Sequence, residues 1–147
     1  MIKVTDNKMV EVNVPQFIRG IQVTSVGQES ILDVNPPGFW ECEKLRKVII
    51  PEGVKVIGGF NRCVSLTQIS LPDTVTDIVS NAFDCCFKLE SIRIPRRLKK
   101  IGTRAFSDNQ AALRLYEKNG FKVDKEKKLS LMRLLGSGYP VKLRRVM

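Results

Sequence analysis

The stretch LTQISLPDTVTDIVSNAFDCCFK, residues 66–88, decides the fold of this 147-residue chain, because the sequence on both sides repeats it. LRKVIIPEGVKVIGGFNRCVS, residues 45–65, precedes it, and LESIRIPRRLKKIGTRAFSDNQ, residues 89–110, follows it. Self-similarity at a period of about 20 to 50 residues is typical of repeat proteins, in which each copy is one structural unit. We therefore predict a stack of similar coils.

The three copies share one skeleton. An apolar residue is followed by a short apolar–x–apolar strand ending in proline, then an apolar pair, a phenylalanine and a small residue. In the middle copy these positions are Leu66, Ile69, Leu71, Pro72, Val75, Ile78, Phe83 and Cys86. Proline ends each strand because it has no N–H for the next ladder bond. A single coil cannot bury its apolar side, so successive coils must stack into a continuous core.

A degenerate first copy precedes these three. VNVPQFIRGIQVTSVG, residues 12–27, supplies a strand and its proline, and FWECEKL, residues 39–45, supplies the phenylalanine and the small residue. Residues 28–38 read as an insertion between them. The pattern from about residue 10 to 106 resembles the BspA-type leucine-rich repeats. The resemblance implies an α/β-type repeat solenoid over residues 1–106, a right-handed coil of about four short-stranded repeats.

Residues 107–147 follow a different pattern, and we predict an α-β-β cap over the last coil. Ser107 and Gln110 have capping-box spacing, and Asn119-Gly120 is a good stop, so a helix is expected over 108–118. FKVD, residues 121–124, and LSLMRLL, residues 129–135, read as strands. YPVKLRRVM, residues 139–147, is a further strand candidate.

The same segment also resembles the C-terminal portion of the GNAT acetyltransferases. Their pattern N-x-x-A-x-x-L-Y-x-x-x-G-F is met by Asn109, Ala112, Leu115, Tyr116, Gly120 and Phe121. The resemblance implies acetyl-CoA as cofactor, Asn109 beside the coenzyme and Tyr116 as the general acid. No glycine-rich phosphate loop precedes the segment, however, so nothing in the pattern holds the coenzyme's pyrophosphate. We expect no cofactor and no acetyl transfer by this chain alone, and keep the acetyltransferase as the alternative.

The four cysteines favour a structural interpretation. Cys42, Cys63 and Cys86 occupy the same position in successive copies, where a free thiol serves as a small buried hydrophobe. Asn109 continues the series, with an amide that can bond to the backbone of the neighbouring coil. Cys85 lies outside the series. The chain has no histidine and no paired C-x2-C, so we expect no metal site.

The residues between the inward strand positions form the candidate binding face. The following residues are expected on its surface: Glu11, Asn13, Lys47, Ile49, Gln68, Ser70, Ser91 and Arg93. Repeat proteins commonly use such a sheet surface for recognition. BspA-type proteins are mostly cell-surface proteins that bind other proteins. We therefore expect a protein partner.

The charge distribution adds another candidate partner. Residues 1–90 carry a net charge of −2 and residues 91–147 carry +12, which together give the chain's +10. The cations Arg93, Arg96, Arg97, Lys99, Lys100 and Arg104 belong to one coil. A basic end of this kind attracts nucleic acid or an anionic surface. The simpler interpretation is a solvated basic face.

The sequence contains no apolar run near the roughly 18 residues of a membrane span. Its first 15 residues lack the apolar core of a signal peptide, so as written we expect the chain in the cytosol. A cell-surface location is expected instead if it is a piece of a longer protein. The pattern does not determine the oligomeric state.

Overall fold

Short parallel strands, stacked one per coil, form the body of the protein. The computed structural model describes residues 8–27, 38–102, 104–106, 109–123 and 143–145. The first sheet contains four strands in the order β1 (Glu11–Asn13), β5 (Lys47–Ile49), β7 (Gln68–Ser70) and β9 (Ser91–Ile92). Every neighbouring pair in this sheet is parallel. The predicted strands before each proline are therefore confirmed.

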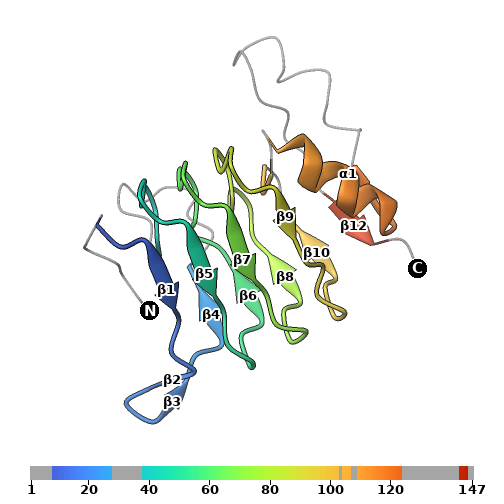
Figure 1. The fold of residues 1–147 in the computed structure, drawn as a ribbon. Helices are drawn as coiled ribbons and strands as arrows, with labels where there is room; N and C mark the ends of the chain where they lie inside the picture. Colours follow the sequence, from blue (N-terminus) through green and yellow to red (C-terminus); the bar gives the residue numbers. More distant parts are fainter. Residues whose placement is uncertain (1–7, 28–37, 103, 107–108, 124–142, 146–147) are drawn as a thin grey trace.

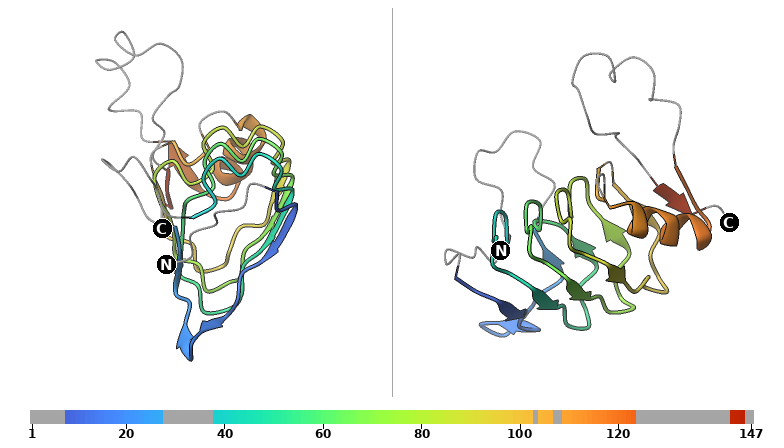
Figure 2. Two further views of the ribbon diagram at one scale, coloured as in Figure 1. Left: turned by 90° about the vertical axis from the view of Figure 1, so that its left-hand side faces the viewer. Right: turned by 45° about the horizontal axis from the view of Figure 1, so that its top comes forward.

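The second sheet lies opposite the first (Figures 1 and 2). Its parallel strands are β4 (Ser25–Val26), β6 (Val56–Ile57), β8 (Asp77–Ile78) and β10 (Lys100–Ile101). Two antiparallel strands then extend it, β12 (Leu143–Arg145) beside β10 and β11 (Phe121–Val123) beside β12. Each coil thus supplies one strand to each sheet, and the core lies between them.

The core repeats as columns of identical or similar side chains. In the first sheet Val12, Val48, Ile69 and Ile92 are in register and buried, and in the second sheet Val26, Ile57, Ile78 and Ile101 are too. The phenylalanines form a third column. The rings of Phe39 and Phe60 stack with centroids 5.0 Å apart, and those of Phe60 and Phe83 are 5.5 Å apart. Phe106 continues the stack at 5.0 Å from Phe83.

The loops between coils also repeat, and they explain the odd cysteine. In the loop before Leu89, Cys86 N–H donates to Phe83 O over 3.2 Å, and Leu89 N–H donates to Cys86 O over 3.2 Å. Two residues after each phenylalanine, Glu41, Arg62 and Cys85 have φ between +56° and +60°. Cys85 therefore occupies the loop position that Glu41 and Arg62 occupy in the earlier coils, and its side chain is half-buried.

A two-stranded hairpin in the first coil was not predicted. Its strands are β2 (Phe17–Ile18) and β3 (Ile21–Gln22), which pair antiparallel around Arg19 and Gly20. Both turn residues have positive φ, +50° and +77°, as a type I′ hairpin turn requires. The insertion predicted at 28–38 lies outside the described residues except for Gly38.

The predicted helix is present as α1 (Gln110–Lys118), but its predicted cap is wrong. Asn109 is the N-cap, and its Oδ1 accepts from Ala112 N–H over 2.9 Å, whereas Ser107 lies outside the described residues. Gly120 follows the helix with φ +85°, as expected. The strand predicted at 129–135 also lies outside the described residues, and β11 pairs instead with β12 from the last segment.

Candidate interaction surfaces

The outer face of the first sheet brings the predicted surface residues together. The register aligns Glu11, Lys47, Gln68 and Ser91 in one row, and Asn13, Ile49 and Ser70 in the next. Glu11, Asn13, Gln68 and Ser70 are exposed and Lys47 is half-buried. The Ile49 side chain is 40% exposed in this otherwise polar row. The rows form a small surface with an apolar residue beside polar neighbours.

An acidic residue changes the chemistry of the basic coil. Both Asp73 carboxylate oxygens lie 2.9 Å from Nη2 of Arg93, and Oδ2 lies 3.5 Å from Nε of Arg96. Oδ1 also accepts from the Arg96 backbone N–H over 3.0 Å, and this bond, aided by the two guanidinium groups, lowers the pKa of Asp73. Arg93 and Arg96 therefore carry less free charge than the sequence suggests.

The remaining predicted cations are distributed around the coil. Arg97 and Lys99 are exposed in the turn between the two sheets, and Lys100 is exposed on β10 of the second sheet. Arg104 is half-buried on the far side of the coil, after Gly102. The six predicted cations therefore lie on different faces of the coil. Arg97 and Lys99 are the closest in sequence to Arg93 and Arg96, the two that pair with Asp73.

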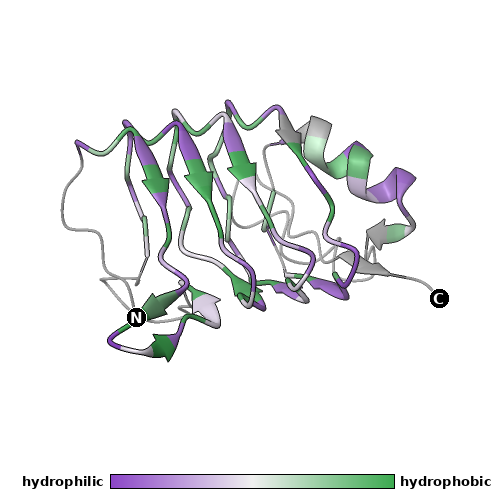
Figure 3. Cartoon of the chain, turned by 60° about the horizontal axis from the view of Figure 1, so that its bottom comes forward, coloured by the Kyte–Doolittle hydropathy of each residue, from purple (hydrophilic) through white to green (hydrophobic). Residues whose placement is uncertain are grey.

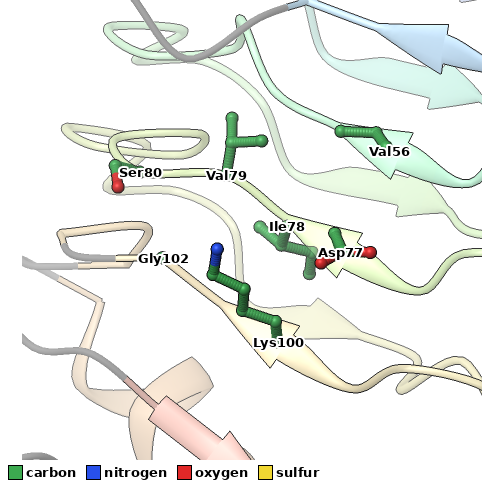
Figure 4. A pocket seen from close by; sticks show the side chains of 7 residues that line it. All are labelled: Val56, Asp77, Ile78, Val79, Ser80, Lys100 and Gly102. Carbon is green, nitrogen blue, oxygen red and sulfur yellow. The ribbon is translucent and has the colours of Figure 1, made fainter. Parts of the chain in front are cut away.

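The outer face of the second sheet has a small open hollow (Figure 4). It has a volume of about 180 Å³ and is lined by Val56, Asp77, Ile78, Val79, Ser80, Lys100 and Gly102. The Asp77 carboxylate accepts from the Thr76 hydroxyl over 2.6 Å. The chain has no histidine, so Ser80 has no imidazole base. Its lining carries one carboxylate, one ammonium group and one hydroxyl, from Asp77, Lys100 and Ser80, beside apolar side chains.

The structure gives Tyr116 and Asn109 structural roles. The Tyr116 ring lies 5.0 Å from the Phe106 ring and 5.6 Å from the Phe121 ring, and its side chain is fully buried. Burial raises the pKa of its hydroxyl above the ordinary range, and this oxygen has no hydrogen-bond partner among the described residues. Asn109 Nδ2 donates to Leu89 O while its Oδ1 caps α1. Both residues are buried, whereas the acetyltransferase hypothesis requires them to contact a coenzyme. The structure therefore gives the resemblance to acetyltransferases no support.

The cysteine column is built as predicted. Cys42, Cys63 and Cys86 are buried, and all four cysteines are free thiols. Cys63 Sγ donates to Phe39 O and Cys86 Sγ donates to Phe60 O, each over 3.0 Å. Burial, the main cause, raises the pKa of Cys86 to about 12 and that of Cys63 beyond the ordinary range. In the described part of the chain, no cluster of three metal-binding side chains occurs.

The hairpin is the surface feature that the sequence reading missed. Phe17 and Ile21 are 54% and 73% exposed, and Ile18 is exposed as well. A signal was available: eight positions separate Pro15 from Val23, against three between Pro51 and Val54. The five extra residues, with Gly20 between the apolar Phe17-Ile18 and Ile21, favour a hairpin. Figure 3 shows the hydrophobic colour on β2 and on part of β3.

Stacked coils that each add one parallel strand to each of two sheets are consistent with a repeat solenoid, and the family match identifies it as a leucine-rich-repeat protein. The family described as the BspA type leucine rich repeat region (6 copies) matches residues 9–122, and the chain belongs to it. No curated protein matches the chain. No helix in the part of the chain that the structure describes has the length and apolar character to cross a bilayer.

Two solved structures are similar to this chain. A leucine-rich repeat protein of T. pallidum is 31% identical with a TM-score of 0.64, and the match covers 74% of this chain and 48% of that one. A leucine-rich repeat protein from Bacteroides ovatus ATCC 8483 is 32% identical with a TM-score of 0.57, covering 67% of this chain and 25% of that one. The chain therefore spans about half of the first protein and a quarter of the second.

Proposed function

We propose that this chain is a non-enzymatic module that binds another protein through the outer face of β1, β5, β7 and β9. The register of the four strands carries the proposal, because it aligns exposed side chains from separate coils into one surface. Proteins with leucine-rich repeats are typically interaction modules, which agrees with this use of the sheet.

The chemistry of the face supports a contact centred on Ile49. A partly exposed apolar residue is surrounded by Asn13, Lys47, Ser70 and Gln68, whose side chains offer donors and acceptors. Protein interfaces commonly combine a small apolar centre with a polar rim, and a few central residues supply most of the binding energy. Arg93, which directly follows β9, adds a guanidinium group whose position is fixed by its ion pair with Asp73.

A photo-reactive residue tests this face directly. Placed at Ser70, it should crosslink to one discrete protein in lysate of the native host, whereas the same residue at Lys55, in the turn between the sheets, should not. Adding Ile49→Glu to the Ser70 probe should abolish the crosslink, because it puts a charge at the apolar centre. Equal crosslinking at both positions, or a crosslink that survives Ile49→Glu, would overturn the proposal.

The proposal includes the finer architecture expected from the sequence. We infer a right-handed solenoid of about four coils, in which α1, β11 and β12 cap the last coil. Two observations support the cap: β12 pairs with β10, and Tyr116 continues the phenylalanine column. BspA-type proteins are often associated with cell surfaces, which supports a cell-surface location.

The basic coil supports a second candidate function, the binding of nucleic acid or another polyanion. Arg97, Lys99 and Lys100 are exposed in four consecutive residues. If all three contact phosphates, raising salt from about 50 to 200 mM should weaken binding to a phosphate column by about 40-fold. Retention that does not respond to salt would exclude this candidate.

A further inference from the structure

The topology places the β2–β3 hairpin at one particular edge of the coil. Each chain segment that runs from the first sheet to the second crosses this edge: residues 51–55, 72–76 and 93–99 do so in the regular coils. In the first coil the hairpin lies between β1 and β4 and therefore occupies the same edge. We call this the turn edge. Figures 1 and 2 show the hairpin extending past the other turns.

The hairpin has no packing reason to be apolar at its surface. Its residues are additional to the repeat, so the core does not require them. Yet Phe17, Ile18 and Ile21 are three of the six large hydrophobic side chains exposed in the described residues. Exposed apolar clusters of this kind mark contact sites.

The hairpin is also held in a fixed position. Val23 N–H donates to Gln16 O over 2.9 Å at its base, and Gln16 Nε2 donates to Glu52 O over 3.3 Å. The Gln22 side chain lies against Gly53 of the next coil. These contacts order the hairpin before any partner arrives, so less conformational entropy is lost on binding.

The turn edge is basic as well. The residues from 15 to 24 and the three regular turns hold six cations, Arg19, Lys55, Arg93, Arg96, Arg97 and Lys99, against the two carboxylates of Glu52 and Asp73. Asp73 is already paired with Arg93 and Arg96. An apolar tip and an excess of positive charge therefore lie along one edge.

We propose that the turn edge docks on an anionic lipid surface, with Phe17, Ile18 and Ile21 inserted among the headgroups. The hairpin is convex, and a bilayer interface accepts a convex apolar tip without a preformed pocket. Arg19, between the apolar residues, then lies at the level of the lipid phosphates and donates to them. Apolar insertion and attraction to anionic lipid are each weak alone and act together. This surface shares only Arg93, which directly follows β9, with the sheet face of the proposed function.

Vesicle sedimentation of the full chain provides the test. The chain should bind vesicles in which about a third of the lipid is phosphatidylserine, and bind phosphatidylcholine vesicles at least tenfold more weakly. Phe17→Ser with Ile21→Ser should reduce binding to the anionic vesicles about tenfold or more. The control is Phe87→Ser, which removes a 61% exposed phenylalanine away from the turn edge and should leave binding unchanged.

A charge-matched pair of variants tests the electrostatic half. Arg97→Glu with Lys99→Glu should weaken binding strongly, whereas Arg114→Glu with Lys118→Glu makes the same change of net charge on α1 and should have a small effect. Equal effects of the two pairs would overturn the proposal, since they would show a response to net charge alone. So would binding unaffected by the hairpin variant, or a hairpin variant that only dissolves a dimer of the chain. The vesicle experiments are independent of the crosslink at Ser70, so their failure would leave the proposed function of the sheet face unaffected.

Discussion

Cys63 and Cys86 are kept as neutral donors by their surroundings. Each sulfur lies 3.0 Å from a phenylalanine carbonyl oxygen of the preceding coil, which accepts the S–H. A thiolate at either position would lose its hydration and would lie against a carbonyl oxygen to which it cannot donate. Burial therefore raises the pKa of both thiols. The column therefore contributes packing and weak hydrogen bonds rather than reactivity.

The burial of the cysteines predicts two rates of thiol labelling. Cys85, which is half-buried, should react first with a maleimide under native conditions, and Cys42, Cys63 and Cys86 should react slowly. Mass spectrometry after partial labelling should find the tag on Cys85. Cys85→Ser should remove the fast phase, and equally fast labelling of all four thiols would contradict the column.

The Cys86 thiol also predicts loss of stability in alkali. Its pKa is about 12 in the folded chain against about 9 for an ordinary thiol, so folding favours the protonated form. Its contribution is complete below about pH 9 and is lost as pH rises toward 12, by up to about 1.4 kcal/mol per pH unit. Cys63 and Tyr116 change in the same direction.

Urea unfolding at a series of pH values measures this effect. Cys86→Ala should lower stability at neutral pH, since it leaves a small cavity, but should reduce the slope above pH 9. An unchanged slope would show that the thiol does not titrate during unfolding.

At the scale of elements, α1 extends the repeat. Asn109 occupies the position of the cysteine column, caps the helix and donates to Leu89 O at the start of the same copy, so the last copy passes directly into α1. Tyr116 then supplies the ring that a further phenylalanine would have provided. The motif from Asn109 to Phe121 was therefore compatible with an acetyltransferase segment and with a structural cap. The burial of Tyr116 favours the structural cap.

Tyr116→Phe tests that distinction. Because the hydroxyl is buried with no partner among the described residues, its removal should leave stability unchanged or raise it by about 1 kcal/mol. Tyr116→Ala should instead cost about 3–5 kcal/mol, because it removes a ring from the core. Thermal or urea unfolding measures both changes.

Coenzyme binding is checked on the same proteins. Calorimetry should detect no binding of acetyl-CoA tighter than about millimolar in the wild type. Micromolar binding that Tyr116→Phe abolishes would restore the acetyltransferase alternative.

Gly102 marks a point where two coils approach each other. A Cβ at this position would overlap the backbone of Val79 and Ser80. Gly102→Ala should therefore destabilise by about 2–3 kcal/mol through a forced backbone shift. Gly120→Ala is the control: a Cβ there meets open space, so only the positive φ of +85° is strained, at about 1 kcal/mol. Similar losses for both variants would contradict the close approach.

The repeat could be predicted residue by residue at the positions that are buried in every coil. The strand residues, phenylalanines and cysteines recur because each coil must fill the same place in the core, and α1 followed from its composition. The hairpin, the cap at Asn109 and the pairing of β11 with β12 were missed, because they depend on the length of one turn or on contacts distant in sequence. The outer rows of the sheet were predicted, whereas the ion pairs of Asp73 were not.

Across the whole molecule, each coil is stabilised mainly by its neighbours. Strand pairs join β1 to β5, β5 to β7 and β7 to β9, and each phenylalanine ring stacks on the ring of the neighbouring coil. In such a linear array, stability is close to a sum of coil and interface contributions. The inner coils have two interfaces each and should open last.

Hydrogen exchange measures this gradient. Amides of β5 and β7, paired on both sides, should exchange more slowly than those of β1, which is paired on one side in the described residues. Phe60→Leu, in the middle of the ring column, should accelerate exchange in both neighbouring coils. Uniform protection across all strands would show that the array opens as a single unit.

The first coil carries five residues more than its neighbours between proline and the next inward valine, yet its strands keep their register with β5 and β6. That edge therefore tolerates added length without disturbing the lattice of inward side chains. For a protein engineer, the Arg19-Gly20 turn is a graft site: a foreign epitope could be inserted there and displayed at a defined distance from the coils.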